Sequence, residues 1–198
     1  MNKLKVLVAI CFLSFATIAS AKDVLKLDVA GVKLGMSPSE VVAALKAKYK
    51  VADSKIKRLK FGGSPYIKGN FISTVELKNA NTTVRVNFGV VPPVNKLKPI
   101  KAENIKYTVA FTNENVAKLK KAVIAKYGKP TANQKTSATL EWCTKAEDVM
   151  SFMGTTKGCS GMKPYLRLNL TRLQLFDPTR NLARAKYKLK GKSANPIL

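Results

Sequence analysis

The stretch Gly31–Tyr49, GVKLGMSPSEVVAALKAKY, decides the fold because it fixes where the first helix begins and which side of that helix is buried. Ser37 followed three residues later by Glu40 predicts a capping box, in which each side chain accepts a hydrogen bond from the other residue's backbone N–H. Pro38 falls at the first helical position, where its missing N–H costs nothing and its fixed φ is already helical. The stretch therefore indicates a helix start rather than a catalytic loop or a ligand cradle.

This first helix carries an apolar stripe. Its members recur at helical spacing, while the lysines between them fall on other sides of the helix: Val41, Val42, Leu45 and Tyr49. Such a stripe is typical of a helix that packs on a core.

A second helix is predicted between Thr112 and Gly128. Thr112 is a suitable N-cap, and Gly128 with Pro130 two residues later is typical of a helix end. The apolar stripe of this helix is Val116, Leu119, Val123 and Tyr127. Both helices close on Lys-Tyr, in AKYK and AKYG, which suggests two related halves, each a helix followed by strands.

Strands fill most of the remaining sequence. Residues 71–77 and 83–89 alternate apolar and polar side chains and are separated by a short polar turn, which predicts an antiparallel hairpin. Residues 104–111 place Ile105, Tyr107, Val109 and Phe111 on one face, and residues 137–143 do the same for Ala138, Leu140 and Trp142.

The segment 165–176, YLRLNLTRLQLF, has leucines with period two whose phase slips by one between Leu170 and Leu173. We interpret it as one strand with a β-bulge near Thr171 and Arg172, which would return both sets of leucines to the core.

These elements predict one α+β domain over residues 22–185, with a mostly antiparallel sheet and two main helices packed on one of its faces. Residues 186–198 are basic, contain proline and are poor in core residues, so we expect a flexible tail.

The first 21 residues predict an export signal. A basic start, MNKLK, precedes an apolar run that ends at Ala19-Ser20-Ala21, which is typical of a signal peptide cleaved after Ala21. We therefore expect a periplasmic or secreted protein. Export places Cys143 and Cys159 where disulfides persist, and these two thiols predict one intramolecular bond.

Charge is the most extreme feature of the composition. Lys and Arg number 36 against 11 Asp and Glu, a formal net charge of +25, and almost all of the cations are lysines. Lysine is a hydrated point charge, so this composition favours diffuse attraction over a shaped anion site. The second helix carries the candidate anion-binding residues Lys118, Lys120, Lys121 and Lys126. The expected partners are an envelope protein or an anionic polymer or lipid surface, with non-specific nucleic-acid binding as a further option.

The chemistry that the sequence permits is narrow. The chain has no histidine, which removes the usual general base and the commonest metal ligand. Glu40, Glu114 and Asp177 have explanations as caps or turn residues, and the adjacent Glu147 and Asp148 are typical of solvated charge. We expect no catalytic residues, no metal and no cofactor.

An apolar group near the second cysteine has two interpretations. Met150, Phe152 and Met153 form either an exposed, adaptable contact surface or a plug at one end of the core.

The residues Gly35-Met36-Ser37-Pro38-Ser39-Glu40-Val41 resemble a motif of small exported bacterial domains. Examples are the small outer-membrane lipoprotein of the barrel-assembly machinery and the β-lactamase inhibitor protein, in which a Gly-Met-Ser/Thr helix start leads into a β-sheet. The resemblance implies an envelope-located binding or scaffolding module without catalysis.

Together these patterns predict a non-enzymatic binding or scaffolding module, periplasmic or secreted, for a protein or an anionic envelope component. Two alternatives stay open: an enzyme that acts on envelope material through Lys, Asp or Glu without histidine, and a structural protein at the outer membrane.

Overall fold

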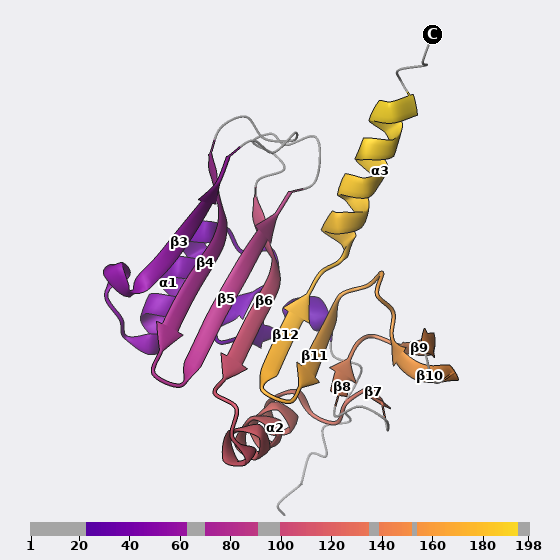
Figure 1. Ribbon diagram of the computed structural model, residues 1–198, viewed down its shortest axis with the longest axis horizontal. Coiled ribbons are helices and arrows are strands. Elements are labelled where there is room, and N and C mark those ends of the chain that lie inside the picture. Colours follow the sequence, from indigo (N-terminus) through magenta and orange to yellow (C-terminus); the bar gives the residue numbers. More distant parts are fainter. Residues whose placement is uncertain (1–22, 63–69, 91–99, 135–138, 152–153, 194–198) are drawn as a thin grey trace, which may run out of the picture.

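An antiparallel sheet of eight strands forms the body of the protein in the computed structural model, as Figure 1 shows. The structure describes residues 23–62, 70–90, 100–134, 139–151 and 154–193, so the predicted signal peptide lies outside the described residues. In spatial order the strands are β3 (Ile56–Phe61), β4 (Phe71–Asn79), β5 (Thr82–Gly89), β6 (Lys101–Val109), β12 (Arg172–Phe176), β11 (Tyr165–Asn169), β8 (Thr139–Trp142) and β7 (Ala132–Gln134).

Two helices pack on this sheet, as predicted, and the α+β class is confirmed. Helix α1 (Pro38–Tyr49) begins with the expected capping box: Ser37 Oγ accepts from the Glu40 N–H, and the Glu40 carboxylate accepts from the Ser37 N–H at 2.7 Å. Helix α2 (Asn113–Tyr127) is capped by Thr112 and ends at Gly128. The apolar stripes of both helices enter one common core, whose helical members are Val41, Val42, Leu45, Leu119, Val123 and Tyr127.

The N-terminal segment completes the cover on the same face. A 3₁₀ turn, η1 (Val24–Lys26), leads into a small hairpin of β1 (Asp28–Val29) and β2 (Val32–Lys33). The side chains of Val24, Leu27, Val29 and Val32 are buried in the common core. The hydroxyl of Tyr127 donates to the Asp28 carbonyl at 2.5 Å, which fixes this segment against the end of α2.

The chain repeats one order of elements. The first half runs α1, η2 (Asp53–Lys55), β3, β4, β5 and β6, and the second runs α2, β7, β8, β11 and β12. The last strands of the halves, β6 and β12, pair in the middle of the sheet, where Lys106 lies opposite Gln174. On either side of that pair Tyr107 is opposite Leu173 and Ile105 is opposite Leu175, so an approximate twofold axis passes between the halves. This is the organisation that the shared Lys-Tyr helix ends suggested.

The strand prediction for residues 165–176 is wrong. The segment is a tight hairpin of β11 and β12, in which Asn169 pairs with Arg172. Its two-residue turn accounts for the slip in leucine phase, because Leu168 then lies opposite Leu173 and both side chains are buried. The predicted hairpin of β4 and β5 is confirmed. Phe111 lies beyond β6 and is 70% exposed, so it does not share the buried face of that strand.

The basic segment 186–198, for which we expect a flexible tail, is helical over residues 186–193. Helix α3 (Thr179–Ser193) includes them, and it extends away from the sheet in Figure 1. Residues 194–198 lie outside the described residues. A long-range ion pair holds the helix, because Arg184 donates to both carboxylate oxygens of Glu103 at 3.0 and 3.1 Å. Gly89 makes room for this pair, since a Cβ at that position would lie 1.7 Å from Glu103 Oε2.

The second half also holds an inserted hairpin, β9 (Ala146–Ser151) with β10 (Gly154–Cys159). The predicted disulfide between Cys143 and Cys159 is confirmed, with a Cα–Cα distance of 5.8 Å, and it ties the end of β10 to the residue that follows β8. Met150 on β9 is 86% exposed, which agrees with a contact surface and excludes a core plug for this residue. Phe152 and Met153 lie outside the described residues.

We predict that replacing both cysteines by alanine lowers the free energy of unfolding. The bond joins residues 16 apart, and closing a loop of that length stabilises a fold by about 3 kcal/mol in the chain-entropy treatment. Urea denaturation of the wild type and of the Cys143→Ala/Cys159→Ala variant measures the difference. Equal unfolding midpoints for the two proteins would contradict the prediction.

Candidate functional site: the open face of the sheet

The sheet has one buried face and one face that no described helix covers. Residues that alternate along each strand point into the core and form rows across the sheet, one of which is Val75, Val86, Ile105, Leu175, Leu166 and Trp142. Their neighbours along each strand point the other way. Figure 1 looks onto this second face, with α1 behind the strands. We call it the open face and define it by Lys57, Glu76, Lys78, Arg85, Asn87, Asn104, Lys106, Thr108, Glu141, Arg167, Asn169, Arg172 and Gln174.

The open face repeats one cross-strand ion pair in both halves. In the first half Arg85 Nε on β5 donates to Glu76 on β4 at 2.7 Å, and in the second Arg167 Nε on β11 donates to Glu141 on β8 at 2.6 Å. Both pairs lie in the same row as the central Lys106 and Gln174, at equal numbers of strands from the axis. The arginine positions are therefore equivalent by the symmetry of the sheet.

These two ion pairs were not predicted, although the sequence contains a signal for them. Thr74-Val75-Glu76-Leu77 matches Thr139-Leu140-Glu141-Trp142, and Val84-Arg85-Val86-Asn87 matches Leu166-Arg167-Leu168-Asn169. Aligning these strand segments, with gaps for the different connections between them, places a glutamate and an arginine at the same points of both repeats.

Glu141 is the most constrained residue of the open face. It is fully buried although it points away from the core, and its second carboxylate oxygen accepts a hydrogen bond from the Cys159 N–H at 2.9 Å. The disulfide fixes that backbone group in place. Arg167 in turn lies over the Tyr165 ring, 4.7 Å from its centroid. The guanidinium is therefore held by a carboxylate and by an aromatic ring.

The environment of Glu76 favours its charged form. Burial alone would raise the pKa of this carboxyl, but the hydrogen bond and charge of Arg85, with a smaller contribution from Lys78, outweigh burial and hold the pKa below its ordinary value. The carboxylate is thus ionised at neutral pH and compensates the charge of Arg85.

A hollow of about 370 Å³ opens on this face at the turn of the β11–β12 hairpin. Its lining is polar and basic except at the turn, and consists of Arg167, Asn169, Leu170, Thr171, Arg172 and Gln174. The corresponding residues of the first half, by register, are Arg85, Asn87, Asn104 and Lys106.

The four lysines predicted as anion-binding lie on α2, away from the open face. Lys118 pairs with Glu114 at 2.5 Å, and Lys126 pairs with Asp28 at 2.7 Å, where it helps to hold the N-terminal segment. Lys120 and Lys121 are exposed. Anion binding at these four lysines stays a prediction.

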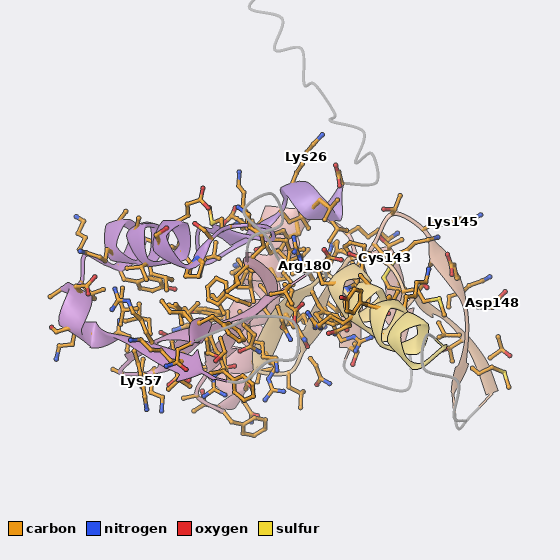
Figure 2. The ribbon with its side chains drawn as sticks, turned by 90° about the horizontal axis from the view of Figure 1, so that it is seen from above. Lys26, Lys57, Cys143, Lys145, Asp148 and Arg180 are labelled. Carbon is orange, nitrogen blue, oxygen red and sulfur yellow. A yellow bond between two sulfur atoms is a disulfide. The ribbon has the colours of Figure 1, made fainter. Side chains whose placement is uncertain are left out.

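Glu147 and Asp148 are each part of a surface ion pair. Glu147 pairs with Lys163 and Asp148 with Lys157, each at 2.8 Å. Figure 2 shows Asp148 on the hairpin at the edge of the molecule, remote from α1. In the described part of the chain, no group of three potential metal-ligating side chains comes together. None of the helices described there has the length and apolar character needed to cross a bilayer.

No protein-family model, curated protein or solved structure matches the chain. The interpretation of the open face therefore rests on its geometry and charge.

We predict unequal effects of removing the two equivalent arginines. Arg167→Gln leaves the fully buried Glu141 without its cation, and breaking such a buried pair costs roughly 3 to 5 kcal/mol. Arg85→Gln should cost less, because Glu76 keeps Lys78 at 3.6 Å. Chemical denaturation of both variants, and of Glu141→Gln/Arg167→Gln, tests this. Equal losses for the two single variants, or no recovery in the double variant, would show that the pairs do not act as proposed.

We also predict an acid-dependent contribution from Glu76. A carboxyl with a lowered folded-state pKa stabilises the fold above its unfolded-state pKa, and that contribution is lost as the pH falls through the folded-state pKa. The stability difference between wild type and Glu76→Gln should therefore be largest at neutral pH and shrink below about pH 4.5. The control is Glu114→Gln, which alters an exposed pair. A difference that does not change with pH would refute the prediction.

Proposed function

We propose that this protein is an exported, non-enzymatic binding module that takes an acidic protein partner on the open face of its sheet. One observation carries the proposal: the helix-covered face forms the common core, while the opposite face presents a largely basic and polar surface. Its exposed or half-exposed cations are Lys57, Lys78, Arg85, Lys106, Arg167 and Arg172.

Arginine side chains of the open face are preorganised, which supports binding. The chain has only six arginines, and three of them lie on the open face. Arg85 and Arg167 are held by glutamates, so little side-chain entropy is lost when a partner arrives. Arginine is also enriched in protein interfaces, where lysine is depleted.

The dimensions of the face also suit a protein partner. The six strands from β3 to β11, at about 4.8 Å spacing, give a surface roughly 25 Å wide; β8 is left out because Glu141 is fully buried there. A standard protein interface needs about 800 Å² on each side, which such a surface can supply. The basic charge of the face then selects a partner of opposite charge.

The arrangement of carboxylates favours binding over catalysis. Glu76 and Glu141 are each neutralised by an arginine and are buried, so they act as supports for the cations rather than as general acids or bases. The helix start at 35–41, with its resemblance to exported envelope modules, and the disulfide favour the same class and a periplasmic or secreted location.

A second candidate is an anionic lipid or polymer surface, favoured by the net charge of +25. The lysines that produce this charge lie on both sides of the sheet, for example Lys57 on the open face and Lys33, Lys48 and Lys120 elsewhere. Attraction of this kind is diffuse and weakens steeply with salt.

We predict that charge reversal on the open face abolishes partner capture. The test variant is Lys57→Glu/Lys106→Glu/Arg172→Glu, and the matched control with the same change in charge is Lys33→Glu/Lys48→Glu/Lys120→Glu. Each is immobilised and exposed to an envelope extract at low and at high salt. A protein retained by wild type and control but lost by the test variant is the expected result.

Two results would count against this proposal. Capture that the test variant retains would exclude the open face. The second result combines two findings. Both variants would lose capture, and in a separate assay both would bind anionic vesicles more weakly than wild type, by the same factor, with no change for neutral vesicles. That result would assign the function to diffuse charge instead.

A further inference from the structure

We infer that the hollow at the β11–β12 turn is a carboxylate-binding site, which takes one acidic side chain of the partner. This inference rests on the proposed function and names the contact that anchors it. The site is built from a two-by-two patch of the open face: Arg167 lies opposite Gln174, and Asn169 lies opposite Arg172. Because the four side chains come from neighbouring strands and point the same way, their polar ends meet over one small area.

Arg167 supplies donors of fixed direction. Its Nε is bonded to Glu141 and its guanidinium lies over the Tyr165 ring. Within the described residues no acceptor is bonded to its two Nη nitrogens, so these remain for a carboxylate in the hollow. Gln174 is also fixed, because its Nε2 donates to Asn104 Oδ1 at 3.1 Å.

Arg172 supplies the charge that the ligand must match. It is exposed, and it has no carboxylate partner in the part of the chain that the structure describes. Arg58, Arg85, Arg167 and Arg184 differ from it, since each pairs with an acidic side chain. An arginine at this place provides a planar fork that matches a carboxylate, which a lysine would not.

The local charge selects a singly charged group. Glu141 compensates Arg167, so the lining of the hollow carries one excess positive charge, that of Arg172. One carboxylate neutralises that charge, whereas a phosphate with two negative charges would be left partly uncompensated beside the buried Glu141. A volume of about 370 Å³ lies near the lower end of ligand pockets, which suits a side chain.

Leu170 forms an apolar wall of the hollow, and its backbone conformation is unfavourable for leucine. Its φ is +46°, a region in which a bulky residue is unfavourable, and its side chain is 43% exposed. Glycine is the usual residue at such positions of hairpin turns. A strained leucine that stays 43% exposed has a functional explanation here, because it lines the hollow beside the arginines and can contact the methylene groups of an acidic side chain.

The first half of the sheet provides an internal contrast. Arg85 and Asn87 match Arg167 and Asn169, but Asn104 stands where Arg172 stands in the second half. Both halves therefore have an arginine paired with a glutamate, Arg85 or Arg167. Only the second half has a further arginine, Arg172, at the position that Asn104 occupies in the first half. We assign the carboxylate site to the second half alone.

The experiment is a titration of the purified protein with butyrate, a monocarboxylate, observed through the Nε–H signals of arginine in ¹H–¹⁵N spectra. Butyramide is the neutral control, and inorganic phosphate and glucuronate are the competing anions. We expect saturable shifts at Arg167 and Arg172 with butyrate and little change at Arg85. Arg172→Gln should weaken butyrate binding by about tenfold, as expected for a lost charge-assisted hydrogen bond, and Lys33→Gln, outside the open face, should leave it unchanged.

The Leu170→Gly variant separates a role of Leu170 in binding from a role in stability. The variant should unfold at a higher temperature than wild type, because the strain is relieved, and should nevertheless bind butyrate more weakly. A variant that is less stable and binds equally well would contradict the role given to Leu170.

Three results would overturn the site: no saturable shift at either arginine, an equal response to butyramide, or tighter binding of phosphate or glucuronate than of butyrate. These failures are distinct from failure of the proposed function. Butyrate binding without partner capture on the open face would leave the site standing and remove the function. Capture that depends on the open face, without butyrate binding, would do the reverse.

Discussion

The ion pair of Glu141 with Arg167 is the interaction on which the second half of the sheet depends. A carboxylate with no exposed surface must be neutralised and hydrogen-bonded where it lies. Arg167 provides the charge from the neighbouring strand, and the Cys159 N–H provides the second hydrogen bond. The disulfide and the β9–β10 hairpin are therefore coupled to the arginine that faces outward. The same carboxylate position in the first half, Glu76, is compensated without an inserted hairpin.

The features that sequence analysis could predict are those with local causes. The capping box of α1, the Thr112 cap of α2 and the apolar stripes depend on residues within one or two helical turns, and the structure reproduces them. The disulfide followed from compartment and from the cysteines left after the predicted cleavage. The hairpin of β4 and β5 followed from two alternating strands and a short turn.

The features that were missed depend on partners far apart in the sequence. Arg167 and Glu141 are 26 residues apart, and Arg184 and Glu103, which hold α3, are 81 apart. The sequence of α3 is basic and has few apolar residues. Nothing in it indicates that Glu103, a buried carboxylate far away in the chain, will bind its first turns. The turn at Leu170 was missed because its backbone conformation favours glycine, and the sequence has leucine there. The open face was missed because it arises only when β6 and β12 pair and join the two halves.

The central claim is that the open face, rather than the overall positive charge, contacts the partner. The abundance of lysine allows a direct measurement: acetylation of surface lysines, read by mass spectrometry, with and without the captured protein bound. Shielding of Lys57 and Lys106, with Lys33, Lys48 and Lys120 reacting equally in both states, is the expected result. Shielding of the lysines on the helix-covered side, with Lys57 and Lys106 still reactive, would contradict it.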